Sequence, residues 1–204
     1  MSRNLEPKGK IVRRLGVNIF GNPKYDRLLE RRPTPPGDAK KHRPRVSEFG
    51  KQLSEKQKLR FAYGLSEKQF RIVFAEAKRM KGVTGDNMMQ LLERRLDNVI
   101  YRLGMAATRT QARQIVNHGH VCVNGKRLNI ASALVRENDV VSVKGKDSSK
   151  KLVQDQISGN VGRDVPEWLL LDKPKMEGKI NRLPVRADVP TIAEERLVVE
   201  FYSK

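Results

Sequence analysis

Cysteine, aromatic residues and long apolar runs are scarce in this sequence. The single cysteine, Cys122, excludes a disulfide within the chain and a metal site built from several thiolates. The longest apolar runs, counting glycine, are five residues long, at 61–65 and 103–107, whereas a membrane-spanning helix needs about 20. No apolar stretch follows the basic residues near the N-terminus, so we expect no signal peptide. These features predict a soluble protein of the reducing cytoplasm.

Acidic residues are few compared with basic ones. The chain has 42 Lys and Arg against 23 Asp and Glu, a net charge of +19 and a pI near 10.3. Residues 1–50 carry 13 basic and 5 acidic side chains, whereas residues 145–204 carry 11 and 10. Such an excess of positive charge repels itself, and a polyanion is the partner that offsets it. We therefore expect the first three quarters of the chain to face a nucleic acid and the last quarter to be scaffold or protein-facing surface.

Residues 1–45 are rich in proline and have no sustained apolar period. The prolines are Pro7, Pro23, Pro33, Pro35, Pro36 and Pro44. Basic clusters lie at 13–14 and 40–43. Because such a segment buries little apolar surface, it is predicted to be a basic extended arm that becomes ordered against its partner.

Four helices are predicted between residues 54 and 119, each ending at a glycine. Three of them begin with Ser or Thr followed by Gln three residues later, a capping box that satisfies free N–H groups of the first turn. These signals are Ser54/Gln57 before Gly64, Ser66/Gln69 before Gly82, and Thr108/Gln111 before Gly119. The other helix is predicted from apolar residues at helical spacing: Met88, Leu92, Leu96, Val99 and Leu103, before Gly104. We expect these apolar residues to form core.

The period changes from helical to alternating after residue 119. Asn124-Gly125 lies between two short extended runs and predicts a hairpin, since a type I′ turn needs positive φ at both positions. A further strand is predicted at 139–143, a loop or hinge with a poorly packed helix at 144–162, and a last strand at 197–202. Trp168, in the segment 166–171, could stack on a base, but the three leucines that follow it favour a place in the core.

Basic side chains between residues 94 and 144 occur at positions that suit RNA. One stripe of a helix, opposite its apolar face, is predicted to carry Arg95, Asn98 and Arg102. Arg109 and Arg113 are four residues apart near a helix start, where free N–H groups favour phosphate. Lys126 and Arg127 follow the hairpin turn. One basic surface of this kind suits the phosphates and 2′-hydroxyls of structured RNA. The alternative is that these arginines form ion pairs with nearby acidic residues, namely Glu93 and Asp97.

Several motifs in this region and its flanks resemble one family. The segments 95–105, 107–116 and 123–126, with His118, are similar to the αL-type RNA-binding domain of the bacterial small-subunit ribosomal protein S-four (uS4) family. That domain also occurs in RNA-modifying enzymes and heat-shock factors. The flanking segments 54–60, 63–64, 67–71, 81–87, 175–178 and 200–204 also resemble the ribosomal protein, and together the matches span nearly the whole chain.

The resemblance implies an α+β fold, in which a mainly helical domain (46–93 and 158–204) contains an inserted αL-type RNA-binding domain (94–157). The inserted domain would have two short helices, a β-hairpin and a small sheet, and the arm (1–45) would precede it. Some family members carry a zinc-binding cysteine set in the first forty-odd residues. This chain has no cysteine there, so we expect neither a metal nor a cofactor.

The implied function is that of a structural constituent of the small ribosomal subunit. The family resemblance implies primary binding to small-subunit (16S-type) rRNA in its five-prime domain, nucleation of subunit assembly and an influence on translational accuracy. Implied partners are the ribosomal protein S-five and, near the entry channel, mRNA; no membrane or small-molecule substrate is expected. The candidate RNA-binding residues are Arg3, Lys8, Lys10, Arg13, Arg14, Lys40, Lys41, Arg43, Arg45, Lys51, Lys56, Lys58, Arg60, Arg71, Arg94, Arg95, Arg102, Arg109, Arg113, His118, Lys126 and Arg127.

Other functions fit these residues less well. The stretch Gly119–Lys126 has five residues between its glycines where a P-loop has four, and Arg127 stands where Ser or Thr is required. His118, His120 and Cys122 lack a fourth metal ligand nearby. An RNA-modifying enzyme would need a catalytic domain for which the flanks leave no room. A free-standing ribosome factor is the third class; it would leave small subunits in a high-salt wash, unlike a ribosomal protein.

Overall fold

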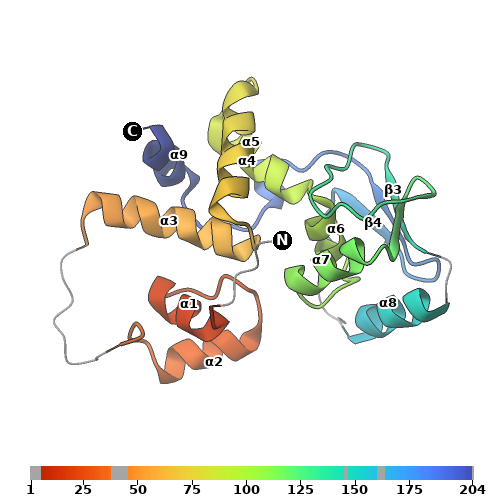
Figure 1. The fold of residues 1–204 in the computed structure, drawn as a ribbon, viewed down its shortest axis with the longest axis horizontal. Coiled ribbons are helices and arrows are strands. Elements are labelled where there is room, and N and C mark those ends of the chain that lie inside the picture. Colours follow the sequence, from red (N-terminus) through yellow and green to blue (C-terminus); the bar gives the residue numbers. More distant parts are fainter. Residues whose placement is uncertain (1–5, 38–45, 145–146, 160–163, 204) are drawn as a thin grey trace. The chain divides into compact units, whose positions relative to one another are not determined.

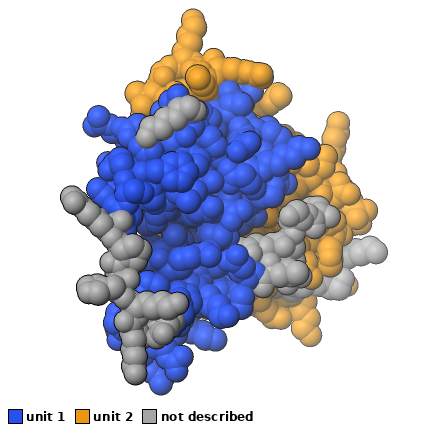
Figure 2. Space-filling view, turned by 60° about the vertical axis from the view of Figure 1, so that its left-hand side comes forward, with its two compact units in different colours: residues 1–76, 191–204 blue, residues 77–190 orange. Residues whose placement is uncertain are grey.

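The computed structural model describes residues 6–37, 46–144, 147–159 and 164–203. The chain forms two compact units, residues 1–76 with 191–204 and residues 77–190 (Figure 2). These limits differ from the domain boundaries predicted from the sequence. No helix in the described ranges has the length and apolar character needed to cross a membrane.

The N-terminal part of the first unit contains two helices, α1 (Lys8–Leu15) and α2 (Pro23–Arg31), so the prediction of an extended arm was wrong for this segment (Figure 1). The sequence has enough apolar residues for a small core, because Ile11, Val12 and Ile19 are almost completely buried. The side chain of Asn22 caps α2 by accepting a hydrogen bond from Lys24 N at 2.9 Å.

Three further helices complete this unit: α3 (Glu48–Ala62), α4 (Glu67–Arg79), in which the chain passes into the second unit, and α9 (Glu195–Ser203). The capping box of Ser66 and Gln69 is confirmed by hydrogen bonds of 3.3 and 3.2 Å. The predicted start at Ser54 was wrong, since α3 begins seven residues earlier with Ser47 as its cap.

The predicted strand at 197–202 was also wrong, because this segment is part of α9. Val198, Phe201 and Tyr202 have the i, i+3, i+4 spacing of one helix face as well as some alternation. The Tyr202 ring lies 4.7 Å from that of Phe74, and the Phe201 ring lies 5.5 Å from that of Phe49. Packing against aromatic residues of α3 and α4 therefore determines the helical conformation.

The second unit begins with α5 (Thr84–Glu93), α6 (Leu96–Arg102) and α7 (Arg109–Asn117). The single helix predicted through Met88 and Leu103 is thus two helices. The break lies at Arg95, which is extended (φ −63°, ψ 134°) and pairs with Leu134 as an isolated β-bridge. The next residues also bond to the loop at 131–135, with Leu96 N donating to Ala133 O at 2.8 Å.

A five-stranded antiparallel sheet has the order β2-β1-β3-β5-β4. Its strands are β1 (Val121–Val123), β2 (Lys126–Arg127), β3 (Val140–Val143), β4 (Leu169–Asp172) and β5 (Glu177–Ile180). The predicted hairpin is confirmed, with φ +50° at Asn124 and +76° at Gly125. Because β5 pairs with β3, the segment carrying β4 and β5 belongs to this unit.

Helices α6 and α7 lie beside the sheet in Figure 1 and share one core with it. Trp168, Val141 and Ile180 are fully buried there, which confirms the core position predicted for Trp168. A short 3-10 helix (Arg186–Asp188) and the helix α8 (Asp147–Gly159) complete the unit. Val153 of α8 is buried in the same core.

Candidate nucleic-acid interface

Two buried carboxylates organise the basic residues of α6 and α7. Glu93 is 1% exposed and accepts hydrogen bonds from Arg102 at 2.9 and 2.7 Å and from Asn98 Nδ2 at 2.8 Å. The side chain of Arg102 is only 14% exposed as a result. Burial without such partners would leave the carboxylate strongly destabilised. Glu93 therefore fixes the orientation of the Arg102 side chain.

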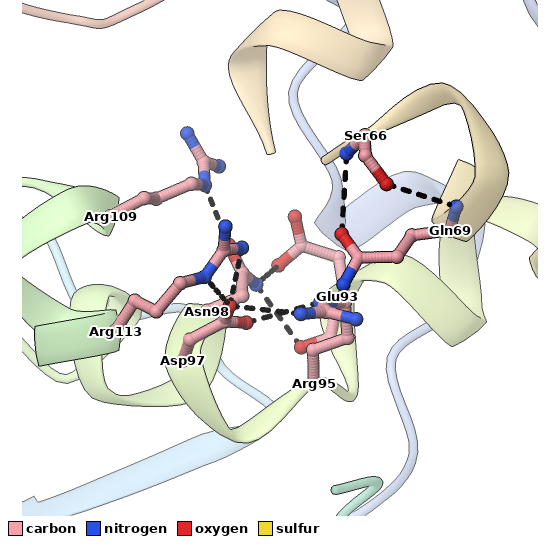
Figure 3. A network of polar contacts seen from close by, with 8 residues as sticks. All are labelled: Ser66, Gln69, Glu93, Arg95, Asp97, Asn98, Arg109 and Arg113. Atoms are coloured by element: carbon pink, nitrogen blue, oxygen red, sulfur yellow. Dashed lines mark hydrogen bonds and ion pairs between the residues drawn. The ribbon is translucent and has the colours of Figure 1, made fainter. Parts of the chain in front are cut away.

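Asp97, 3% exposed, holds two arginines at once (Figure 3). Arg95 donates to its two carboxylate oxygens at 3.1 and 3.0 Å and is itself 5% exposed. Arg113, which comes from α7, donates through Nε and a terminal nitrogen to Oδ2 at 2.8 and 2.6 Å, and its side chain remains 24% exposed. Asp97 thus joins one buried guanidinium and one that reaches the surface.

Arg109 enters the same network through a neutral partner. Its Nε donates to Asn98 Oδ1 at 2.8 Å (Figure 3). Its guanidinium also lies 4.5 Å from the centre of the Tyr101 ring. The backbone start of α7 is held by Thr108, which accepts from Gln111 N at 3.2 Å, while Gln111 Oε1 accepts from Ala107 N at 2.9 Å. Thr108 is confirmed as the cap of α7 and positions Arg109 in the first helical turn, but the predicted capping box is not complete, because Gln111 bonds the N–H of Ala107 instead of that of Thr108.

The network combines four guanidinium groups with two carboxylates, so it retains a net charge of +2. The predicted outward stripe of Arg95, Asn98 and Arg102 was wrong, because these side chains turn toward Glu93 and Asp97. The alternative that the sequence left open, ion pairing with Glu93 and Asp97, holds for Arg95, Arg102 and Arg113. Arg102, Arg109 and Arg113 are the arginines of the network that are only partly buried, and Arg109 and Arg113 extend from adjacent turns of α7. Their guanidinium groups are held in place before any ligand binds.

A second basic group lies where the end of α7 meets the hairpin. Lys126, Arg127 and His118 are exposed. Arg127 packs over the backbone of Gly119, whose missing Cβ leaves room for the guanidinium, and donates to His118 O at 3.4 Å. Burial lowers the pKa of His120 below its ordinary value, and the neighbouring charges of His118, Arg127 and Lys144 lower it further.

The side chain of Arg94 is half-buried and supports a loop. Its Nε donates to Val135 O at 3.0 Å, and its own carbonyl accepts from Val135 N at 3.0 Å. Burial, and then the charge of Arg136, lower the pKa of Arg94, while Asp139 raises it. Arg94 therefore fixes the chain that follows the hairpin and brings a half-buried positive charge close to Arg136.

The predicted residues of the N-terminal segment differ in how far they are used internally. Lys10 is exposed, and Lys8 Nζ lies 5.2 Å from the centre of the Phe20 ring. Arg13 donates to the carbonyls of Thr34 and Pro35 at 2.9 and 3.2 Å, so it ties the segment after α2 to α1. Arg14 forms an exposed ion pair with Glu6 at 3.0 Å. Arg3, Lys40, Lys41, Arg43 and Arg45 lie outside the described residues.

The predicted residues of α3 and α4 are engaged along the helix surface. Lys51 pairs with Glu48, Lys58 with Glu55 and Arg71 with Glu67, while Arg60 donates to Gln57 at 2.6 Å. Lys56 is different, because it is 5% exposed, lies 4.7 Å from the centre of the Phe201 ring and pairs with Glu67 at 3.0 Å. Lys56 is therefore an interior residue of this unit.

The sequence prediction left out several exposed basic residues, and four of them lie close together in the N-terminal segment: Lys24, Arg27, Arg31 and Arg32. All four belong to α2 or follow it directly. The spacing of Lys24, Arg27 and Arg31, three and four residues apart, could have identified them as one group. That spacing places them on one face only in a helix, whereas the sequence analysis predicted an extended segment. Within the described residues, no group of three His, Cys, Asp or Glu side chains could hold a metal ion.

Comparison with known proteins covers the whole chain. Residues 3–93 match the family model described as the ribosomal protein S4/S9 N-terminal domain, and residues 94–141 match the S4 domain. Proteins named small ribosomal subunit protein uS4 are similar over their full length. The protein from Borrelia duttonii is 51% identical over 206 residues, 100% of this chain and 99% of the relative. The one from Treponema denticola is 49% identical over 201 residues, 98% of this chain and 97% of the relative.

Proposed function

Because this chain belongs to the small ribosomal subunit protein uS4 family, we propose that it binds small-subunit (16S-type) rRNA through the basic surface of α7 and the hairpin. Its role as a structural constituent of the small subunit follows from the family. The observation that carries the RNA-binding proposal is the prearranged pair Arg109 and Arg113, within a network that keeps a charge of +2.

The arrangement favours phosphates and 2′-hydroxyl groups over base edges. A-form RNA presents a wide, shallow minor groove with these groups, and its deep major groove is closed to side chains. Arg113 is fixed by Asp97 and Arg109 by Asn98, so less side-chain freedom is lost when RNA binds. The free N–H groups at the start of α7 add a favourable dipole for a phosphate placed beside Arg109.

The proposed RNA-binding set contains the predicted residues other than Lys56 and Arg95, whose burial removes them from the surface. Within the described residues it comprises Lys8, Lys10, Arg13, Arg14, Lys51, Lys58, Arg60, Arg71, Arg94, Arg102, Arg109, Arg113, His118, Lys126 and Arg127. The proposed role is binding without catalysis.

The finer part of the proposal concerns the place in the subunit. We propose primary binding in the five-prime domain of the rRNA, nucleation of assembly, contact with the protein S-five, proximity to mRNA at the entry channel and an influence on translational accuracy. The family resemblance supports these roles. The nearly balanced charge of residues 145–204 also suits a surface that faces another protein better than one that faces RNA.

The salt dependence of RNA binding tests the role of the α7 pair. The double variant Arg109→Ala/Arg113→Ala should lower the slope of log K against log salt by about 1.6, because each of the two phosphate contacts contributes roughly 0.7–0.9. A matched control, Lys175→Ala/Arg196→Ala, removes the same charge from exposed side chains in the balanced part of the chain. Equal slopes for the double variant and this control would contradict the proposal.

A further inference from the structure

The turn of the hairpin between β1 and β2 is an Asn-Gly pair. Asn124 and Gly125 have positive φ values of +50° and +76°, and both residues are exposed. An asparagine before glycine is chemically unstable in a flexible chain, because glycine has no side chain to shield its backbone nitrogen from the asparagine amide. No other asparagine of the sequence is followed by glycine. This turn is therefore the position at which a spontaneous covalent change is easiest.

The reaction open to this pair is deamidation, which needs only water as co-reactant. The Gly125 nitrogen attacks Cγ of Asn124, so a new N–C bond forms while the bond between Cγ and Nδ2 breaks. Ammonia leaves with the proton of the Gly125 N–H, and a five-membered imide ring remains. Water then opens the ring at one of its two carbonyls, which gives aspartate or isoaspartate. No oxidation or reduction is involved, and the exposure of both residues lets water reach the ring.

The backbone of the folded turn opposes ring closure. In the imide, Cβ of Asn124 and the nitrogen of Gly125 lie nearly in one plane about the bond between Cα and the carbonyl carbon. That plane requires a ψ far from the roughly +30° that a type I′ turn imposes at this position. Asn124 therefore has to leave its turn conformation before it can react, so the contacts that hold the turn control the reaction.

Both ends of the Asn124 amide are bonded to the start of β3. Its Nδ2 donates to Asp139 Oδ1 at 2.8 Å, and its Oδ1 accepts from Val140 N at 2.9 Å. The backbone N of Asn124 also donates to Val140 O at 2.8 Å. Departure of Nδ2 as ammonia has to break its bond to Asp139, which is the one with an ionised acceptor and hence the strongest of the three.

Asp139 is held in place independently of Asn124. Its Oδ2 accepts from Arg136 N at 2.7 Å, and its backbone N donates to Arg136 O at 3.2 Å. Its carbonyl accepts from Ile180 N of β5 at 3.0 Å. The loop before β3 and the neighbouring strand thus fix the carboxylate where the Asn124 amide meets it.

We infer that Asn124 is a latent deamidation site and that the Asp139 carboxylate keeps it unreacted in the folded protein. A chain that has not yet paired β1 with β3 lacks this contact and deamidates. The product does not regain the contact, because a carboxylate replaces the donor Nδ2 beside Asp139 and like charges repel. Isoaspartate also lengthens the backbone of the turn by one carbon. The reaction therefore marks copies that stay unfolded and loosens the hairpin that carries Lys126 and Arg127.

The test incubates the full chain at slightly alkaline pH, with and without denaturing urea. Mass spectrometry of the tryptic peptide 114–126 follows the conversion of Asn124, and enzymatic methylation counts the isoaspartate. The folded wild type should react slowly and the protein in urea much faster. The variant Asp139→Ala, still folded, should react about tenfold faster than the wild type. That factor corresponds to about 1.4 kcal/mol, near the lower end of what a hydrogen bond to a charged group contributes.

Three further variants separate the carboxylate from general stability. Asp139→Asn keeps an acceptor oxygen but loses the charge, so it should give an intermediate rate. Val141→Ala removes core contacts of the same strand without touching the Asn124 amide, and it should keep the wild-type rate. Asp172→Ala removes a carboxylate that accepts from Lys175 N at 3.1 Å in another turn of the sheet, and it should keep that rate as well. Urea unfolding identifies the variants that are folded during the incubation.

Each part of the inference has a result that overturns it. No conversion in urea would show that the pair is not reactive, and equal rates with and without urea would show that the fold gives no protection. A wild-type rate for folded Asp139→Ala would remove the role of the carboxylate. The same conclusion would follow if Val141→Ala reacted as fast as Asp139→Ala. If Asp139→Ala does not fold, the rate of Asp139→Asn decides, and a wild-type rate there overturns the inference.

Discussion

Replacing Asp97 with alanine removes the carboxylate that Arg95 and Arg113 share. Arg95 is 5% exposed and has both its carboxylate contacts, at 3.1 and 3.0 Å, with this one residue. Arg113 has a side chain that is 24% exposed, so it can turn toward water. The cost of the substitution should therefore come mainly from Arg95, which stays buried with its charge uncompensated.

The expected loss of unfolding free energy for Asp97→Ala is about 3–5 kcal/mol, the usual cost of breaking a buried ion pair from one side. Arg95→Met should cost less, about 1–3 kcal/mol, because Asp97 keeps its bonds to Arg113. The double variant should be more stable than the sum of the two single effects predicts, with a coupling of roughly 2 kcal/mol. Removing both partners eliminates the buried charge that makes the single change costly.

Urea unfolding provides the assay, with the slope m checked to be the same in all variants. Asp155→Ala serves as a control, because it removes an exposed carboxylate from α8 and should change stability by less than about 0.5 kcal/mol. A loss below about 1 kcal/mol for Asp97→Ala, or additive effects in the double variant, would refute the role given to this carboxylate.

Two further substitutions test particular contacts. Gly119→Ala, at φ +71°, places a methyl group against the Arg127 guanidinium. It should cost about 1–3 kcal/mol of stability and lower the salt slope of RNA binding by about 0.8. The control Gly104→Ala, at φ +74° in open space, should be strained without changing that slope. Tyr202→Phe loses a 2.8 Å hydrogen bond to Glu67 and should cost about 1.5 kcal/mol at neutral pH. Burial, and then Glu67, raise the pKa of Tyr202, so this contribution is present below about pH 10 and is lost at higher pH; urea unfolding across that range should show the two proteins converging. A constant difference in stability would contradict the pKa argument, and an equal salt slope for both glycine variants would contradict the contact with Arg127.

Local signals in the sequence predicted the elements that depend only on neighbouring residues. The Thr108 cap of α7 and the turn at Asn124-Gly125 are satisfied within a few residues, so their geometry follows from the sequence. The helix α9 could not be predicted in this way, since its apolar spacing fits a strand as well. Aromatic partners that are distant in the sequence decide between the two.

The candidate site was predicted in composition but not in arrangement. The sequence indicated that Glu93 and Asp97 could pair with arginines, yet the partners depend on the break between α5 and α6. That break comes from a β-bridge between Arg95 and Leu134, almost forty positions apart. Arg95 consequently turns inward and forms an ion pair with Asp97, which also pairs with Arg113 of the helix α7. Contacts over such a separation leave no periodic pattern in the sequence.

The most direct test of the account is chemical footprinting of the purified protein on naked small-subunit rRNA, with large-subunit rRNA as competitor. Specific phosphate recognition by a prearranged surface predicts protection confined to one junction in the five-prime domain, which persists with the competitor. Diffuse protection that the competitor removes would show that the net charge of +19 alone drives binding and would contradict the account.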